Sequence, residues 1–482
     1  MDVSEDKHIT IVSMDIDVRR PTSSVMRQVI VSLVSSALSI VCGSSLSYSG
    51  IVVPQILDRE NGTSFNVTSK ELLWISSSTS LAIPIGVALA GFTMDAWGRL
   101  ATLKLSVIPN VIGWTLIAAA QNGLMVIFGR MFTGISYGLS SGPAFVYISE
   151  VSDSKIRGAL LCIPGIFFSI GILLTYFKGW LLHWRWVSWI FLIYSVISVI
   201  ITLFLPESPS WLISKGRNIE AKKSLQWFRT VKDLGTKKSE DDELNELVEQ
   251  HVQNVRHSTK TDLRVFLKPT CYKPFMIISV LFAFQQFSGL YVITLNSVIF
   301  FKDIRAAIDP YQASVYMGVL RLVVCLFGMW VTNKVGRRSL MMVSAGGMAC
   351  CMIVSGLFTQ WIYEGTTTQT WVPIFTTFIY FIFSSIGLQI LPFAIASEIF
   401  PQSVRGVMQG LALTICYLLM FASLHSYGML KEAFGGAPGL QYFFATMSLI
   451  AVVFIFLFVP ETFRKTLSEI EAYFWHKVFY IK

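Results

Sequence analysis

The chain has 482 residues, of which 53% are hydrophobic and only 14% are charged, whereas soluble chains carry about 25% charged residues. This composition excludes an ordinary soluble globular protein and indicates membrane-spanning segments of about 20 apolar residues each. The formal net charge is +9, but the basic residues gather in the predicted loops of one side, so the charge reflects membrane topology and gives no reason to invoke nucleic acid.

Twelve apolar segments of membrane-spanning length follow one another along the chain. They cover residues 29–52, 72–94, 101–119, 125–148, 158–177, 187–205, 274–295, 313–333, 339–358, 371–397, 404–427 and 440–460. The sequence therefore predicts an all-α membrane protein with twelve transmembrane helices. Residues 1–28 contain several acidic residues and no apolar core of the signal-peptide type, so the first span should be an uncleaved anchor.

Lys and Arg residues set the predicted orientation, because short cytoplasmic loops are enriched in them. With the N-terminus in the cytoplasm, the predicted outer loops carry only Arg59, Lys70, Lys178, Arg185, Lys302, Arg305 and Lys431, while Arg130 and Arg321 lie near or within spans. Both tails, 1–28 and 461–482, are then cytoplasmic. The first outer loop holds Asn61 and Asn66, each in an N-x-[ST] motif, and both are predicted glycosylation sites.

Three short motifs occur twice in the same order. "DAWGRL" (95–100) is matched by "NKVGRR" (333–338), "SEVSDSKIRG" (149–158) by "SEIFPQSVRG" (397–406), and "PESPSW" (206–211) by "PETFRK" (460–465). Each motif follows the equivalent span of its half, which indicates a duplication. Two parallel six-span halves are the internal symmetry of the major facilitator fold, so we expect six-helix bundles at 29–205 and 271–460.

The repeated motifs place charges at the cytoplasmic ends of the helices. These residues are Asp95, Arg99, Glu150, Arg157, Arg337, Arg338, Glu398 and Arg405. Carboxylates and guanidiniums from opposite halves could pair there and hold the inner side shut, since arginine binds carboxylates bidentately. The alternative is that they only anchor the topology; their recurrence at matched positions favours gating.

The segment between the bundles, 206–270, is hydrophilic and differs from both. It contains "KKSEDDELNELVEQ" and has apolar residues at helical spacing, Leu244, Leu247, Val248 and Val252. This pattern predicts short amphipathic cytoplasmic helices, with a disordered linker as the alternative.

Two adjacent amides interrupt the apolar stretch "LFAFQQFSGLYVITLNSVIF" (281–300). Unsatisfied amides facing lipid would cost several kcal/mol each, so Gln285 and Gln286 should face the protein interior or an aqueous cavity. On a continuous helix they share a face with Asn296, and Gly289 permits local opening beside them. Amides both donate and accept hydrogen bonds, as the hydroxyl groups of a neutral polyol do. An interhelical amide hydrogen bond is the alternative.

The motifs together resemble those of the sugar porter family of the major facilitator superfamily. The matching pieces are "GRMFTGISYGLSSGPAFVYISEVSDSKIRG" (129–158), "PESPSWL" (206–212), "QQFSG" (285–289), "VGRRSL" (335–340), "SEIFP" (397–401) and "VPET" (459–462). The resemblance covers all spans and the central segment. The "QQFSGLY" variant is most similar to the insect branch of facilitated trehalose transporter-like and facilitative glucose transporter-like proteins.

The resemblance implies that Gln285 and Gln286 hold a sugar, but other positions that contact sugar in the family are changed. Tyr291 replaces an asparagine, Asn296 replaces a tyrosine, and Phe393 replaces a tryptophan. We include these three among the predicted substrate-binding residues, although plain packing is nearly as good an account of Phe393. Further departures are Gly165, Asn333, Ser385, Leu295 and the pair Cys416-Tyr417. The substrate is thus expected to be a small neutral sugar or polyol of open identity.

Proton symporters of the family carry an aspartate in the first span, where this chain has Ser47 or a neighbour. No Asp or Glu occurs between Arg27 and Gln55, and a proton carrier needs a titratable group at membrane depth. The sequence therefore predicts facilitative uniport of trehalose or a hexose by alternating access at the plasma membrane, with the chain acting as a monomer.

Other functions are less well supported by the sequence. A proton-coupled sugar symporter and a non-transporting sugar sensor on the same fold remain alternatives. An ion channel is disfavoured, because no span holds a ring-forming acid or a filter-like loop. No G-x-S-x-G motif, P-loop or metal-ligand spacing appears, so we expect no enzyme, cofactor or metal.

Overall fold

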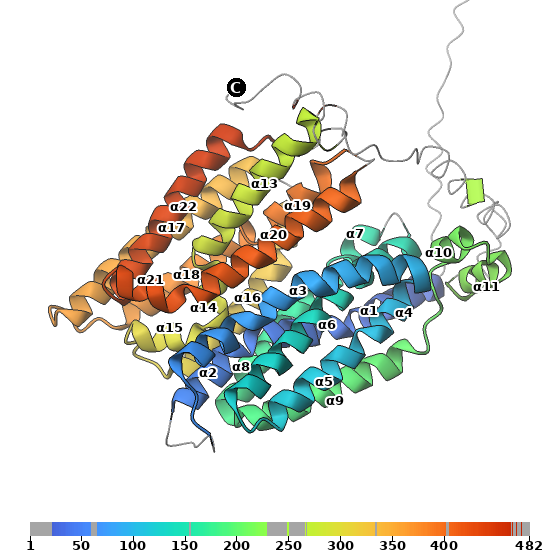
Figure 1. Ribbon diagram of the computed structural model, residues 1–482. Helices are drawn as coiled ribbons and strands as arrows, with labels where there is room; N and C mark the ends of the chain where they lie inside the picture. Colours follow the sequence, from blue (N-terminus) through green and yellow to red (C-terminus); the bar gives the residue numbers. More distant parts are fainter. Residues whose placement is uncertain are drawn as a thin grey trace, which may run out of the picture.

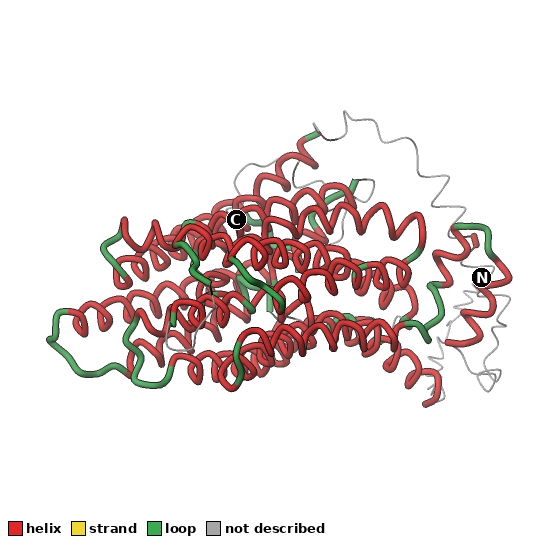
Figure 2. Tube along the Cα trace, turned by 60° about the horizontal axis from the view of Figure 1, so that its bottom comes forward, coloured by secondary structure: helices red, strands yellow, loops and turns green. Residues whose placement is uncertain are grey.

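The computed structural model describes residues 22–58, 65–153, 156–228, 248–249, 266, 268–332, 335–401, 404–463, 465, 469 and 474. The described residues form helices joined by short loops, with no strand among them (Figure 2). This confirms the predicted all-α class. The site Asn61, Asn333 and most of residues 229–267 lie outside the described residues.

The first half of the chain forms one bundle, coloured blue to green in Figure 1. Its helices are α1 (Thr22–Ser47), α2 (Ser49–Leu57), α3 (Ser69–Trp97), α4 (Arg99–Leu105), α5 (Val107–Ala118), α6 (Gly123–Val151), α7 (Arg157–Leu160), α8 (Ile163–Leu181) and α9 (Trp184–Thr202). Two short helices follow beside it, α10 (Pro209–Ser214) and α11 (Asn218–Phe228), where the sequence predicts amphipathic helices.

The second half forms a separate bundle, coloured yellow to red in Figure 1. Its helices are α13 (Pro269–Phe287), α14 (Leu290–Leu295), α15 (Ser297–Asp303), α16 (Pro310–Thr332), α17 (Arg337–Tyr363), α18 (Trp371–Ile386), α19 (Leu391–Glu398), α20 (Arg405–His425), α21 (Tyr427–Ala433) and α22 (Ala437–Phe458). The sequence repeats predict the bundle bounds 29–205 and 271–460, and these bounds stay a prediction.

Ten helical runs among the described residues are long and apolar enough to cross a membrane. The other two predicted spans correspond to α6, which contains Arg130 and Glu150, and to the interrupted run α13–α15. Large apolar side chains cover the outside of the bundles, among them Phe92 and Phe204, which are 77% and 79% exposed. Such surfaces are stable only against lipid or another apolar partner.

Helices α3 and α6 pack with their backbones in close approach. A Cβ at Gly134 would lie 2.3 Å from the carbonyl oxygen of Thr79, and one at Gly138 would lie 2.4 Å from that of Ile83. Small residues spaced four apart allow this approach between membrane helices. Gly142, at the same spacing one step further along α6, faces open space and does not contribute.

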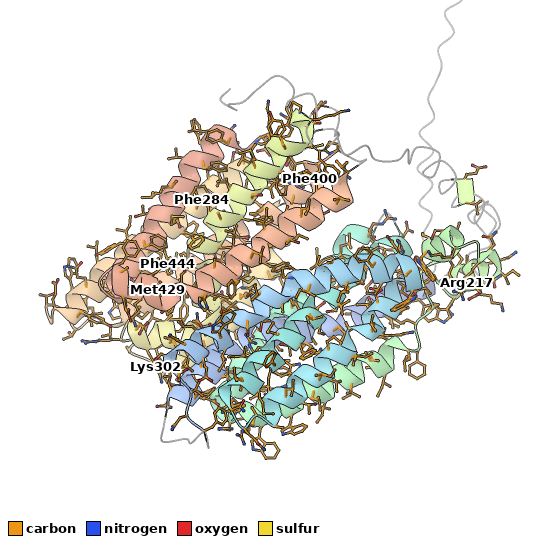
Figure 3. All side chains as sticks on the ribbon, viewed as in Figure 1. Arg217, Phe284, Lys302, Phe400, Met429 and Phe444 are labelled. Atoms are coloured by element: carbon orange, nitrogen blue, oxygen red, sulfur yellow. The ribbon has the colours of Figure 1, made fainter. Side chains whose placement is uncertain are left out.

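The two bundles meet where α2, α14 and α15 lie, and they diverge away from this end (Figure 1). Here Ser49 Oγ donates to the carbonyl oxygen of Leu295 at 3.0 Å, and Tyr176 donates to that of Thr294. The Lys302 ammonium lies 3.6 Å from the Asp58 carboxylate across the same junction (Figure 3). The end at α2 and α15 is therefore held together by bonds between the two halves.

Candidate binding site at the junction of the two halves

The run α13–α15 is interrupted at Gly289, close to the adjacent glutamines. Helix α13 ends at Phe287, Gly289 has φ +94°, and α14 begins at Leu290. Glycine adopts this left-handed conformation without a steric penalty. A Cβ at this position would also lie 2.6 Å from Cδ2 of Phe444 in α22. Both the backbone and the packing thus require glycine at the interruption.

Gln285 joins α13 to a second interruption, which separates α18 from α19. Its Nε2 donates to the carbonyl oxygens of Leu388 and Gln389 at 2.8 and 3.1 Å. These carbonyls are available because the chain between Ile386 and Leu391 leaves the α-helix. A buried carbonyl needs a donor, and the Gln285 amide supplies it. Gln285 is fully buried.

Gln286 has a different environment from its neighbour. Its Nε2 donates to Gln285 Oε1 at 3.2 Å and approaches Cys416 Sγ of α20 at 3.4 Å. Its Oε1 is buried without a hydrogen-bond partner in the described structure. An unpaired buried acceptor is costly, so this oxygen is available to a hydroxyl group of a bound molecule.

Arg321 places a positive charge beside the same unwound segment. It is 6% exposed and stands at the midpoint of α16. The Gln389 amide can make hydrogen bonds to both of its neighbours when its Oε1 faces Arg321. In this orientation Oε1 accepts from Arg321 Nη1 at 2.9 Å and from Nη2, and Nε2 donates to Ser385 Oγ at 2.9 Å. The motifs do not point to Arg321 as a site residue; the signal that finds it is a lone charge in mid-span.

Aromatic side chains from both halves surround this cluster. The Arg321 guanidinium lies 5.8 Å from the ring centre of Phe168 in α8. Tyr137 of α6 and Tyr417 of α20 approach with their hydroxyl oxygens 3.4 Å apart. Tyr291 is 9% exposed in α14 and is close enough to Arg321 for electrostatic interaction. The predicted site residue Tyr291 therefore lies beside the cluster.

The contacts described for the other two predicted binding residues are with groups other than the amide pair. The Asn296 Oδ1 accepts from Ser76 Oγ of α3 at 2.9 Å, so Asn296 helps to join the halves. The interruption at Gly289 breaks the continuous helix that would have placed it on the face of Gln285. The Phe393 ring packs 5.2 Å from that of Phe282, which fits the packing alternative.

The charged motifs form equivalent ion pairs in the two halves. Arg99 binds Glu150 bidentately, with Nη2 donating to Oε1 at 2.8 Å and Nε at 3.1 Å from both oxygens. Arg337 likewise pairs with Glu398. Each ion pair lies within one half, whereas the sequence predicts ion pairs between the two halves. The difference follows from the arrangement, because the bundles diverge at this end (Figure 1).

The third repeated motif also has the same role in each half. The Glu207 carboxylate accepts from the backbone N–H groups of Arg99 and Leu100 at 3.1–3.2 Å, and the Glu461 carboxylate accepts from those of Arg337 and Arg338 at 2.9 and 3.2 Å. Both carboxylates thereby cap a helix N-terminus, where negative charge is favourable. The motifs that are repeated in the sequence therefore make equivalent contacts in the two halves.

The remaining predicted gating residues make contacts with backbone oxygens or are exposed. Arg157 donates to the carbonyl oxygen of Ser152 at 3.1 Å, Arg405 to that of Phe400 at 3.3 Å, and Arg338 to that of Phe456. Asp95 is exposed. None of these four is placed in an ion pair by the contacts described here, so their gating role stays a prediction.

A predicted glycosylation site and an apolar groove lie on the surface, outside this cluster. Asn66 is exposed in the loop before α3, as a glycosylation acceptor must be.

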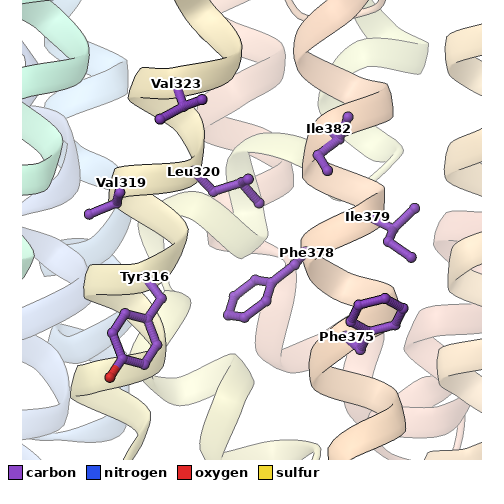
Figure 4. A pocket seen from close by; sticks show the side chains of 8 residues that line it. All are labelled: Tyr316, Val319, Leu320, Val323, Phe375, Phe378, Ile379 and Ile382. Carbon is purple, nitrogen blue, oxygen red and sulfur yellow. The ribbon is translucent and has the colours of Figure 1, made fainter.

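An apolar groove of ≈ 420 Å³ lies between α16 and α18 and is lined by Tyr316, Val319, Leu320, Val323, Phe375, Phe378, Ile379 and Ile382 (Figure 4). It has almost no polar surface and opens on the outside of the bundle, so it suits an acyl chain better than a sugar.

The helical bundles, their shared internal symmetry and the polar cluster between them define a membrane transporter of the major facilitator type. Its residues 31–474 match the family model described as "Sugar (and other) transporter", and the chain belongs to this family. It is a transporter and not an enzyme.

Known relatives agree with this assignment. The facilitated trehalose transporter Tret1 of Polypedilum vanderplanki is 29% identical over 463 residues, covering 95% of this chain and 90% of that protein. Tret1 of Apis mellifera ligustica is 29% identical over 460 residues, with the same coverage of 95% and 90%. The inward open conformation of the xylose transporter XylE from E. coli superposes with a TM-score of 0.74 at 20% identity, covering 92% of this chain and 99% of that one.

Proposed function

We propose that the protein is a facilitative sugar carrier, which moves trehalose or a hexose down its gradient by alternating access. The observation that carries this proposal is the cluster of Gln285, Gln286 and Gln389 at paired helix interruptions between two six-helix bundles. Interrupted helices at the midplane between repeats are where transporters of this kind bind their substrates. The names of the trehalose-transporting relatives support a sugar as the substrate class.

The bonds between the halves support alternating access. They include the pairs Ser49–Leu295, Ser76–Asn296 and Asp58–Lys302, all at the end of α2 and α15. With the N-terminus in the cytoplasm, this end faces outward, and the diverging end faces the cytoplasm. The described arrangement would then be inward-facing, and the outward-facing state would require these bonds to break.

The surroundings of Arg130 support uniport over proton symport. This guanidinium is 1% exposed and donates to the backbone carbonyl oxygens of Ile75, at 3.2 Å, and Ser45. It also lies 5.8 Å from the ring centre of Tyr48. The α1–α2 stretch, which supplies Ser45 and Tyr48, contains no Asp or Glu, and the two acids of α3, Glu71 and Asp95, lie near the ends of that helix. The groups that hold this charge are therefore not titratable carboxyls, and a proton has no acidic carrier there.

Uptake measurements in oocytes would test the carrier function and its energy source. Cells that express the chain should take up labelled trehalose or glucose saturably, and a protonophore or a change of external pH should leave the initial rate unchanged. Water-injected cells are the control, and surface biotinylation confirms delivery to the plasma membrane. Loss of uptake on collapse of the proton gradient would show symport instead. Absence of uptake with the protein at the surface would favour a sensor.

A further inference from the structure

We infer that this site prefers a sugar carrying one carboxylate over a neutral sugar of the same size, and that Arg321 binds the carboxylate. The inference rests on the transport function proposed above and narrows its substrate class, since the sequence motifs alone lead to a neutral sugar. Three observations carry it: the burial of Arg321, the absence of a neutralising carboxylate among its contacts, and its connection to the amide pair.

The first observation is the depth of the charge. Arg321 is the middle residue of the 23-residue helix α16 and is 6% exposed. At a rise of 1.5 Å per residue, it lies about 16 Å from either end of that helix. A side chain at such a depth cannot extend to an interface as a charge near a helix end can. The positive charge is therefore part of the site.

The second observation is that this charge is held by neutral groups. Its contacts are the Gln389 amide oxygen and the face of the Phe168 ring, and its Nε is buried without a hydrogen-bond partner in the described structure. Helix α16 itself and the nearby helices α8, α14 and α18 contain no Asp or Glu. Two other nearby helices each carry one acid that is already paired: Asp303 of α15 accepts from Lys431 and Tyr427, and Glu398 of α19 pairs with Arg337. Protein interiors normally pair a buried charge with an opposite one; among the described residues, no carboxylate contacts Arg321.

The third observation connects Arg321 to the residues that suit a sugar. Gln389 accepts from Arg321 through its side chain, while its backbone carbonyl accepts from Gln285 Nε2 at 3.1 Å. Gln285 in turn bonds to Gln286, whose Oε1 is an unpaired buried acceptor. The cluster thus offers an unpaired charged donor, Arg321 Nε, and an unpaired acceptor, Gln286 Oε1. A molecule with a carboxylate and a hydroxyl group satisfies both.

The amount of charge favours a carboxylate over a phosphate. The cluster holds a single guanidinium, whose charge one carboxylate neutralises. A phosphate monoester carries about −1.5 to −2 at pH 7 and would leave negative charge uncompensated among these apolar helices. The expected ligand is therefore a monoanionic sugar acid of hexose size, in which a carboxylate replaces one hydroxymethyl group.

Glucose and glucuronate form a matched pair for the test, because they differ only in that replacement. In oocytes that express the wild-type chain, labelled glucuronate should show a KM at least about tenfold lower than glucose, the factor that corresponds to about 1.4 kcal/mol. Uniport of an anion moves charge, so clamped cells should pass a current with glucuronate and none with glucose. Glucose 6-phosphate should compete poorly with labelled glucuronate.

Substitutions at Arg321 separate a binding role from a structural one. Arg321→Gln should raise the KM for glucuronate about tenfold more than it raises the KM for glucose, so that the preference is lost, and Arg321→Lys should retain part of the preference because it keeps the charge. Arg217→Gln is the matched control, since Arg217 is an exposed residue of the α10–α11 loop that pairs with Glu220. A structural residue would instead lower uptake of both sugars equally, and that result would overturn the inference.

A binding measurement on the purified wild-type protein keeps the inference testable if Arg321 variants do not fold. A ligand that binds the folded state raises the thermal midpoint, and glucuronate should raise it at lower concentrations than glucose does. Equal effects of the two, or a lower KM for glucose, would overturn the preference while leaving the carrier function intact. If neither sugar is taken up or stabilises the protein, both the carrier function and the preference fail.

Discussion

The adjacent residues Gln285 and Gln286 have different tasks, although the sequence presents them as a pair. Their apolar surroundings predict that both face inward, because the cost of an unsatisfied amide in lipid applies to both. The sequence does not predict that Gln285 donates to two carbonyls more than 100 residues away. Those carbonyls become acceptors only because their own helix is interrupted, which is a property of the folded arrangement.

Gln285→Leu should abolish uptake and also destabilise the protein. The change leaves the carbonyls of Leu388 and Gln389 buried without this donor, at a cost of about 1–3 kcal/mol each, so the two interruptions lose their connection. Uptake assays on surface-matched cells and the thermal midpoint of the purified protein measure the two effects. Normal uptake by this variant would refute a role for Gln285 in the site.

Gln286→Leu is expected to act on affinity more than on stability. Its Oε1 has no hydrogen-bond partner among the described residues to lose, although Nε2 loses its bonds to Gln285 Oε1 and Cys416 Sγ. One neutral hydrogen bond to substrate contributes about 0.5–1.5 kcal/mol, or roughly a twofold to twelvefold rise in KM. The thermal midpoint should fall less than in Gln285→Leu. A KM equal to that of the wild type would show that the substrate does not use this oxygen.

At the scale of elements, the sequence predicts where the helices lie but not where they are interrupted. Apolar runs and motifs locate the spans to within a few residues, because burial and lipid exposure both require apolar side chains. The seventh span, predicted at 274–295, is instead three helices over 269–303, and the tenth is split after Ile386. Apolarity does not report an interruption, because apolar residues continue through it. Gly289 is the local signal, and it marks the position of the first one.

Gly289→Ala should destabilise the fold and reduce uptake. The residue has φ +94°, and a Cβ would lie 2.6 Å from Phe444, so alanine adds backbone strain of about 1–3 kcal/mol and a clash. Gly91→Ala in α3, where a Cβ meets nothing within 4 Å, is the matched control and should be neutral or slightly stabilising. Thermal unfolding of both variants decides the matter: equal midpoints would mean that the interruption tolerates a side chain.

At the scale of the whole molecule, the repeated motifs predict two equivalent bundles, and the structure confirms them through the equivalent pairs Arg99–Glu150 and Arg337–Glu398. The sequence cannot tell whether such charges pair within a half or across the junction. Both arrangements use the same residues, and which one forms depends on whether the bundles are together or apart at that end. In the present arrangement each pair lies in its own half. The predicted ion pairs between the halves, the latch, could therefore form only in the state in which the cytoplasmic end is closed.

Glu150→Gln should shift the equilibrium towards the inward-facing state. The substitution removes a carboxylate that binds Arg99 bidentately at 17% exposure and that, in the latch hypothesis, faces basic residues of the other half when the cytoplasmic end closes. Loss of this carboxylate weakens the bond to Arg99 in both arrangements, but it removes charge-assisted hydrogen bonds to the other half in the closed arrangement alone, so the closed arrangement loses more stability. The shift should therefore have a single direction, whichever sugar is bound.

Distances between the halves would measure this shift. Spin labels at Gly158 and Val407, both exposed at the diverging end, should report a larger share of long distances in Glu150→Gln, after the accessible cysteines Cys162, Cys325 and Cys350 are replaced. Glu220→Gln, which removes the exposed pair with Arg217, should leave the distribution unchanged. An unaltered distribution in Glu150→Gln would make these charges topological anchors, because a residue that stabilises one state of a carrier must change the balance between its states when it is removed.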